Sequence, residues 1–150
     1  MTDKAGRQNP ARPIIGVGAV VWRDGKVLLI RRGKPPKAGE WSLPGGAQEL
    51  GETVIESLIR EVFEETSIQI ENIRFLEIVD LIVPGDAADA PRYHYTLLDF
   101  SADATPHSTD PVPGDDADAA IWADPDNLEP YGLWAKTIEV IKTSQQQRNS

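Results

Sequence analysis

Residues 53–66 constrain the fold more than any other part of the chain, because their apolar side chains recur with helical spacing. The bulky aliphatic positions fall at i, i+3, i+4 and i+7, and they are Ile55, Leu58, Ile59 and Val62. This spacing predicts an amphipathic helix whose aliphatic stripe faces a core. Thr53, followed three residues later by Glu56, predicts a capping box at the start of that helix.

Three glutamates, Glu61, Glu64 and Glu65, crowd the end of the predicted helix. Their offsets of three and four residues place them on one flank of it, where like charges repel. The helix macrodipole also disfavours anions near a C-terminus, by a few tenths to about 1 kcal/mol each. No Lys or Arg follows at i+3 or i+4. The cluster is therefore either a solvated acidic face or a site for Mg²⁺, with Mn²⁺ as an alternative, since both ions prefer oxygen ligands.

A longer pattern surrounds this helix. Gly46 is followed after five residues by Glu52, and Glu52 after seven residues by Arg60-Glu61-Val62-Phe63-Glu64-Glu65-Thr66-Ser67-Ile68. This resembles the box motif of the Nudix hydrolase family, Gly-x5-Glu-x7-Arg-Glu-U-x-Glu-Glu-x-Gly-U, where U is bulky and apolar. Residues 41–46 and 49–53 are also similar to Nudix hydrolases. The one departure is Ser67, which replaces the second glycine at a helix end where the left-handed conformation favours glycine.

The resemblance implies a metal site. In the family the clustered glutamates bind divalent ions, which assigns Glu61 and Glu65 as the main ligands here, Glu64 as an assisting ligand and a backbone carbonyl of Gly45 as a further one. Glu61 is also a candidate for the general base. Without the resemblance, the Gly45-Gly46 pair would be only a tight turn.

Two further residues of the motif have supporting roles in the family. Arg60 holds a glutamate in position, and Glu52 supports the metal cluster, so we count both with the catalytic residues. The alternatives are that Arg60 pairs along the helix with Glu56 or Glu64, and that Glu52 is a charge favoured near the helix N-terminus.

A later acidic loop offers an extra ligand or base. In many family members that group comes from a loop that corresponds to the region of Asp115, Asp116 and Asp118 here. For any single one of the three, the sequence favours an ordinary loop acid.

Substrate-binding candidates are basic and aromatic. Arg31 and Arg32 flank the loop before Trp41 and are suited to gripping a diphosphate, or they form a solvated edge. Trp41 and Tyr93 are suited to stacking on a base, or they belong to the core. Residues 93–102 are similar to a stretch of ADP-ribose pyrophosphatase-like Nudix proteins.

The order of elements predicts an α+β domain. We expect a mobile tail at residues 1–12, one domain at 13–146 and a hairpin of residues 14–22 and 26–32. Further strands are expected at 41–43, 73–83, 93–100 and 119–123, a turn at Pro44-Gly45-Gly46 and a loop at 105–118. A second helix is expected at 133–144, with Trp134, Ile138 and Ile141 on its buried face. The resemblance implies a Nudix-type α/β/α sandwich with a mixed sheet.

Composition limits the function classes. The 150 residues fit one domain, and the absence of cysteine excludes disulfides. The formal net charge of -9 argues against nucleic acid or an anionic membrane as partner. The longest apolar run, residues 17–22, is too short to span a bilayer, and the polar start predicts no secretory signal. We therefore expect a cytoplasmic protein, with a homodimer as one arrangement that the sequence allows.

The function expected from the resemblance is Mg²⁺-dependent hydrolysis of a nucleoside diphosphate linked to another group. ADP-ribose, cleaved to AMP and ribose 5-phosphate, is the favoured substrate. One alternative is a pyrophosphohydrolase that sanitises the (d)NTP pool. Another is a non-catalytic nucleotide-sensing module, which would not need so costly a carboxylate cluster.

Overall fold

The computed structural model describes residues 7–34, 37–87 and 90–150. Its strands are β1 (Ile14–Arg23), β2 (Lys26–Arg32), β3 (Trp41–Ser42), β4 (Gly45–Ala47), β5 (Ile70–Val83), β6 (Tyr93–Ala104) and β7 (Ala117–Ala123). Its helices are α1 (Val54–Thr66), the short 3₁₀ helix η2 (Glu129–Tyr131) and α2 (Ala135–Asn149).

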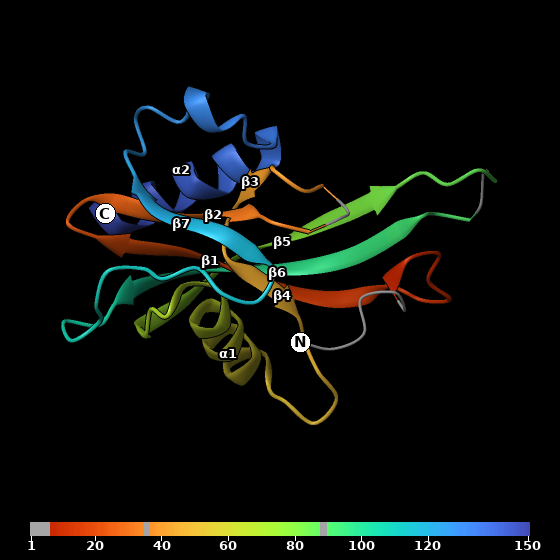
Figure 1. Cartoon of the computed structure of the whole chain (residues 1–150), viewed down its shortest axis with the longest axis horizontal. Helices are drawn as coiled ribbons and strands as arrows, with labels where there is room; N and C mark the ends of the chain where they lie inside the picture. The colour runs from red at the N-terminus through yellow and green to blue at the C-terminus, as the bar shows by residue number, and fades with distance from the viewer. Residues whose placement is uncertain (1–6, 35–36, 88–89) are drawn as a thin grey trace.

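In the described residues, seven strands form one mixed sheet. The main path is β3-β2-β1-β6-β5, while β4 pairs with β1 and β7 pairs with β2. The β1–β6 pair is parallel and the other pairs are antiparallel. Helices α1 and α2 cover opposite faces of the sheet (Figure 1). The predicted α/β/α sandwich is confirmed.

Strand β1 supplies both halves of the core, because its successive side chains point to opposite faces. Its odd-numbered residues pack with α1, and its even-numbered residues pack with α2. The first cluster includes Val17, Ala19, Val21, Leu58 and Val62. The second includes Val20, Trp22, Val140 and Ile141.

The β1–β2 hairpin forms as predicted. Its central residues, Asp24 and Gly25, have φ angles of 50° and 76°. Left-handed backbone at both central positions is the conformation that two-residue hairpin loops favour, and Asp-Gly is a preferred sequence for it.

The aliphatic stripe predicted for α1 is rotated in the structure. Leu58 and Val62 are fully buried, but Ile55 and Ile59 are 40% and 42% exposed. Glu61 and Glu65 are buried in their place. The i, i+3, i+4, i+7 spacing is kept by the buried residues Leu58, Glu61, Val62 and Glu65. Two glutamates therefore lie on the face of α1 that packs against the sheet.

Several predicted boundaries differ from the structure. Strand β5 starts at Ile70 and β6 continues to Ala104, because the two pair along their whole length from Ile70 with Ala104 to Val83 with Tyr93. Strand β7 starts inside the expected loop. The expected turn at Gly45-Gly46 is strand β4, held by pairing with β1.

The C-terminal helix α2 is longer than predicted, and the exposure of Trp134 at its start differs from the prediction. It runs to Asn149, past the expected end at residue 144, because its glutamines are compatible with a helix. Ile141 is buried as predicted, whereas Trp134 is the N-cap residue and half exposed.

The N-terminal tail lies partly outside the structure. Residues 1–6 of the predicted tail are not among the described residues. Within residues 7–12, the Asn9 N–H donates to the Arg92 carbonyl at 2.8 Å. No helix in the described ranges is long and apolar enough to cross a membrane.

Candidate active site

Both ends of α1 are fixed by local hydrogen bonds. The Thr53 hydroxyl accepts from the Glu56 N–H, and the Glu56 carboxylate accepts from the Thr53 N–H, so the predicted capping box is confirmed. At the other end, Ser67 has a φ of 63°, and its N–H donates to the Phe63 carbonyl at 2.8 Å. Serine therefore takes the left-handed conformation at the position where the family motif has glycine.

Arg60 joins α1 to the segment that precedes it. Its Nε and Nη2 donate to the two carboxylate oxygens of Glu52 at 2.6 and 2.9 Å. Its Nη2 also donates to the Ala47 carbonyl at 3.2 Å. The hydrogen bonds from Arg60 lower the pKa of Glu52 to about 2, and those to Glu52 raise the pKa of Arg60. This forked contact is stronger than a single ion pair on a helix surface.

Arg60 also reaches the glutamate cluster. Its Nη1 lies 3.0 Å from Glu61 Oε1 and 3.3 Å from Glu64 Oε2. The expected repulsion among the glutamates is therefore partly offset by a cation that precedes them, although none follows at i+3 or i+4. The predicted pairing of Arg60 with Glu64 is present, but Glu52 is the closer partner.

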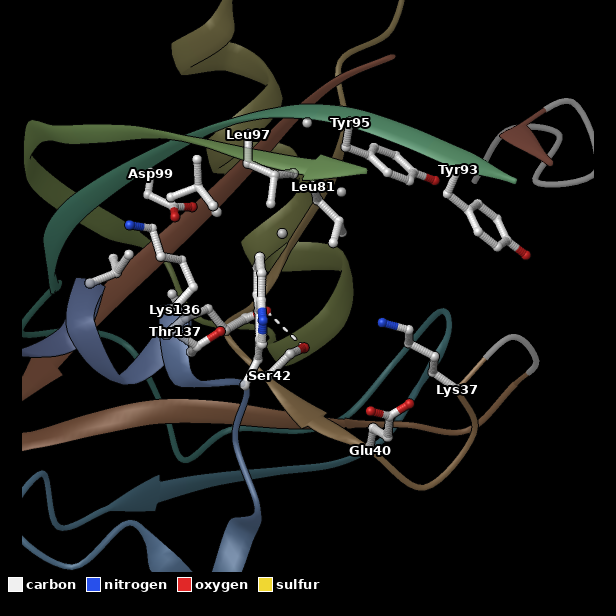
Figure 2. Close-up of a pocket in the computed structure, with 18 of the residues that line it drawn as sticks. Lys37, Glu40, Ser42, Leu81, Tyr93, Tyr95, Leu97, Asp99, Lys136 and Thr137 are labelled. Atoms are coloured by element: carbon white, nitrogen blue, oxygen red, sulfur yellow. Dashed lines mark hydrogen bonds between the residues drawn. The ribbon is translucent and has the colours of Figure 1, made fainter. Parts of the chain in front are cut away.

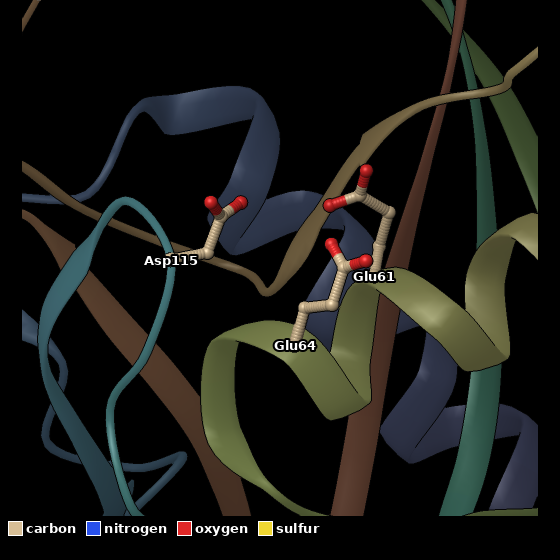
Figure 3. Close-up of side chains that lie close together, drawn as sticks. All are labelled: Glu61, Glu64 and Asp115. Carbon is tan, nitrogen blue, oxygen red and sulfur yellow. The ribbon is translucent and has the colours of Figure 1, made fainter. Parts of the chain in front are cut away.

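Glu61, Glu64 and Asp115 bring carboxylate oxygens within 4.8 Å of one another (Figure 3). Glu61 is 1% exposed, Glu64 is intermediate and Asp115 is exposed, so the group opens from the protein interior to solvent. Each donor is a carboxylate oxygen, the type that Mg²⁺ and Mn²⁺ prefer. The residues present therefore fit a hard divalent cation.

Asp115 reaches the helix because its loop docks on the last turn of α1. The Val112 N–H donates to the Thr66 carbonyl at 2.8 Å, and the Gly114 N–H donates to the Glu65 carbonyl at 3.1 Å. These bonds satisfy carbonyls that a helix end leaves without intrahelical partners. A Cβ at Gly114 would lie only 2.6 Å from the Glu64 carbonyl oxygen, so this approach requires glycine.

Glu65 lies beside this group and contacts β4. It is buried, and its Oε1 accepts from the Gly45 N–H at 2.8 Å. A Cβ on Gly46 would overlap the Glu61 carboxylate, and one on Gly45 would overlap the backbone of β1 at Val17. The two glycines let β4 pass between β1 and the glutamates.

The other two predicted loop acids point elsewhere. Asp116 is buried, and its Oδ1 lies 3.7 Å from Lys34 Nζ. Asp118 is on β7, where its Oδ1 accepts from Arg31 Nε at 2.7 Å. Of the three, the structure brings Asp115 to the glutamates.

A cavity of about 620 Å³ borders β4 on the side facing α2 (Figure 2). Arg32, Trp41 and Tyr93 line it, together with Gly45 and Gly46. Arg31 does not belong to the lining. Its guanidinium instead lies over the Trp41 ring, 5.6 Å from the centroid.

Two glycines of β1 leave room for this cavity. Gly16 and Gly18 stand at even-numbered positions, whose side chains would face α2, and both line the cavity. Their partners on β6 are Leu97 and Asp99. A Cβ at either glycine would lie 2.7 Å from the partner's side chain, so the lack of side chains on β1 lets Leu97 and Asp99 extend over this strand as part of the cavity wall.

Asp99 is a lining residue that the sequence interpretation did not include. Its side chain is 7% exposed, and burial, with a smaller effect from the nearby Glu77 charge, raises its pKa to about 6. The sequence feature that could have identified Asp99 is its position as an acid within the otherwise apolar run Leu97-Leu98-Asp99-Phe100.

Several known proteins are similar to this chain in sequence and fold. The family model of the NUDIX domain matches residues 12–143. The ADP-ribose pyrophosphatase of Methanocaldococcus jannaschii is 36% identical over 116 residues, which cover 77% of this chain and 64% of that protein. Phosphatase NudJ of Escherichia coli is 31% identical over 100 residues, which cover 66% of this chain and 64% of that protein. The matched segment thus spans slightly less than two thirds of each of these relatives.

A solved structure matches over nearly its whole length. The crystal structure of MutT NUDIX hydrolase from Burkholderia pseudomallei superposes with a TM-score of 0.75 at 32% identity. The match covers 88% of this chain and 98% of that one. The chain belongs to the Nudix hydrolase family.

Proposed function

We propose that this Nudix protein is a Mg²⁺-dependent pyrophosphohydrolase of nucleoside diphosphates linked to another group, with ADP-ribose as its substrate. The observation that carries the proposal is the pair of adjoining sites. Glu61, Glu64 and Asp115 converge beside β4, and the cavity borders the same strand at Gly45 and Gly46. A diphosphate lying along β4 would have its phosphorus atoms beside the carboxylates and its attached groups in the cavity.

Glu61, Glu64 and Asp115 would hold the metal ion, with Glu65 and the Gly45 carbonyl kept as predicted ligands. When bound, the ion would neutralise charge on the phosphate oxygens and lower the pKa of a coordinated water. Arg60 keeps the carboxylates of Glu61 and Glu64 in place by donating to both, and Glu52 anchors Arg60 from the other side. This support orients the ligands before the substrate arrives.

A general base among the carboxylates would accept the proton from the attacking water. Glu61 is the base predicted from the resemblance, and its oxygen accepts from Arg60. Asp115 is the alternative because it is exposed and can pass a proton on to solvent.

Cavity residues would bind the rest of the substrate. Arg32 and Lys37 line the cavity and supply positive charge for the phosphates. Trp41 and Tyr93 offer ring faces for a base. Arg31 would act indirectly, since it packs over Trp41 and pairs with Asp118.

ADP-ribose is favoured because the M. jannaschii relative is an ADP-ribose pyrophosphatase and is 36% identical over 77% of this chain. The expected products are AMP and ribose 5-phosphate. A panel of nucleotides with Mg²⁺, followed by product separation, tests this choice. Reaction in heavy-oxygen water would label one product and identify the phosphorus attacked.

The same panel tests the two alternatives. Pyrophosphate release from (d)NTPs without turnover of ADP-ribose would favour the pool-sanitising enzyme. Tight nucleotide binding without turnover of any substrate would favour the sensing module. A cytoplasmic location and a homodimer stay predictions from the sequence.

A further inference from the structure

Asp99 places a buried carboxylate in the wall of the cavity. It lies on β6 near Leu97, and Figure 2 shows it far from Tyr93 along the lining. Much of the surrounding lining is apolar, including Leu97, Val79 and Val140. A carboxylate in such a wall is costly unless a hydrogen-bond donor meets it.

No donor from the described residues meets Asp99. Its carboxylate forms neither a hydrogen bond nor an ion pair with any of them. Its cross-strand partner on β5 is Glu77, another acid. The nearby cation Lys136, which also lines the cavity, pairs with Glu139 at 3.3 Å.

Asp99 is also separated from the carboxylates of the metal site. In the sheet, Gly18 pairs with Gly45 on one side and with Asp99 on the other. Two strand spacings, roughly 10 Å, therefore separate the backbones of Asp99 and Gly45, and the Asp99 side chain reaches over Gly18, which lies between them. Because Asp99 and the glutamates approach from opposite sides of β4, we expect Asp99 to contact a group attached to the diphosphate.

We propose that Asp99 is a specificity-determining residue that accepts a hydrogen bond from an amino or hydroxyl group of the substrate. This inference rests on the proposed function, because it assumes a nucleotide in the cavity. The donor is either the amino group of the base or a hydroxyl of a ribose. Both offer a neutral N–H or O–H to a carboxylate, and a substrate without that group would leave Asp99 buried and unsatisfied.

The test is equilibrium binding in metal-free buffer with a chelator, where no turnover occurs. The ligands are ADP-ribose, its analogue with hydrogen in place of the 6-amino group, and analogues that lack the hydroxyls of one ribose or the other. The wild-type protein is expected to bind one of these analogues about tenfold to a hundredfold more weakly than ADP-ribose, the effect of one hydrogen bond to a charged group.

Asp99→Leu, which keeps the size but removes the acceptor, should lose this discrimination. Asp99→Asn keeps an uncharged acceptor and should reduce it, since bonds to a charged acceptor are stronger. Glu77→Leu is the matched control, because it removes the cross-strand acid that does not line the cavity, and it should keep the wild-type preference. Melting curves establish whether each variant is folded. If Asp99→Leu is not folded, Asp99→Asn alone tests the role of Asp99.

The outcomes separate this inference from the function it rests on. If the wild-type protein neither binds nor hydrolyses any nucleotide, both proposals fall. If it binds and hydrolyses ADP-ribose but Asp99→Leu and Asp99→Asn discriminate as the wild type does, only the role of Asp99 falls. Equal binding of all analogues by the wild type would also overturn it. Loss of discrimination in Asp99→Leu supports it, and the analogue affected identifies the donor.

Discussion

Arg60 grips Glu52 through two nitrogens, with Nε and Nη2 at 2.6 and 2.9 Å from the two carboxylate oxygens. The residues are eight apart, so the contact ties the loop before α1 to the second turn of the helix. Because the same guanidinium donates to Glu61 and Glu64, this pair holds both the fold and the carboxylates of the site.

The first prediction concerns acid stability. The pKa of Glu52 falls from 4.5 to about 2 on folding, so its stabilising effect is complete above pH 4.5 and is lost as the pH falls towards 2. Glu52→Gln should therefore lower the melting temperature at pH 7 and flatten its fall between pH 5 and 2. Glu71→Gln, at an exposed position on β5, is the control. Parallel pH profiles for wild type and Glu52→Gln would contradict the coupling.

The second prediction concerns metal binding. An ion that binds only the folded chain raises its stability, by about 2.7 kcal/mol at a concentration one hundred times Kd. Mg²⁺ or Mn²⁺ should therefore raise the wild-type melting temperature, and Asp115→Asn should reduce this gain. Asp118→Asn removes a neighbouring acid that pairs with Arg31 and should keep the gain. Identical metal responses in the wild type and Asp115→Asn would place the site elsewhere.

The third prediction concerns turnover. Glu61→Gln should cut kcat by roughly a hundredfold or more, because it removes the buried charge that helps to hold the metal and orient the water. Circular dichroism should remain that of the wild type, since a glutamine oxygen can still accept from Arg60. Glu56→Gln, in the capping box of the same helix, should keep wild-type kcat. Near-normal turnover in Glu61→Gln would remove this residue from both its predicted roles.

Features that depend on a few neighbouring residues follow from the sequence, whereas features that depend on tertiary packing do not. The capping box of Thr53 and the Asp24-Gly25 hairpin depend on a few neighbouring residues, and both were predictable. Whether Ile55 or Glu61 faces the sheet depends on what the sheet presents. The spacing of the aliphatic residues predicted that Ile55 faces the sheet. In the structure Glu61 does so instead, because the guanidinium of Arg60 and the absence of a side chain at Gly46 accommodate its carboxylate.

The residues of the candidate site also divide into those that the sequence identifies and those that only tertiary contacts identify. Asp115 could be named as a candidate, but choosing it over Asp116 and Asp118 required the docking of its loop on the end of α1. Arg31 and Arg32 are equivalent in the sequence. In the structure Arg32 lines the cavity and Arg31 lies over Trp41, and the pairing of β2 with β7 shifts register between these two arginines, an irregularity that the sequence does not reveal.

The fourth prediction concerns the pH dependence that Asp99 imposes. Burial raises its pKa from 3.8 to about 6, so the folded state keeps a proton that the unfolded chain has lost between those values. Stability therefore falls as the pH rises from about 4 to 6, and the penalty stays constant above that. Asp99→Asn should melt at a higher temperature than wild type at pH 7, with the difference shrinking towards pH 4. A difference that does not vary with pH would contradict burial of the Asp99 charge as its cause.

The fifth prediction separates the two neighbouring arginines. Arg32 lines the cavity and is suited to gripping phosphate oxygens, so Arg32→Ala should raise the KM for ADP-ribose by about tenfold while changing kcat less. It should leave the metal concentration needed for half-maximal activity unchanged. Arg31→Ala is the matched control, one residue away on the same strand. Its loss frees Asp118 and uncovers Trp41, so a smaller rise in KM is expected. Equal increases for the two variants would mean that both arginines reach the substrate, which is what the sequence alone predicted.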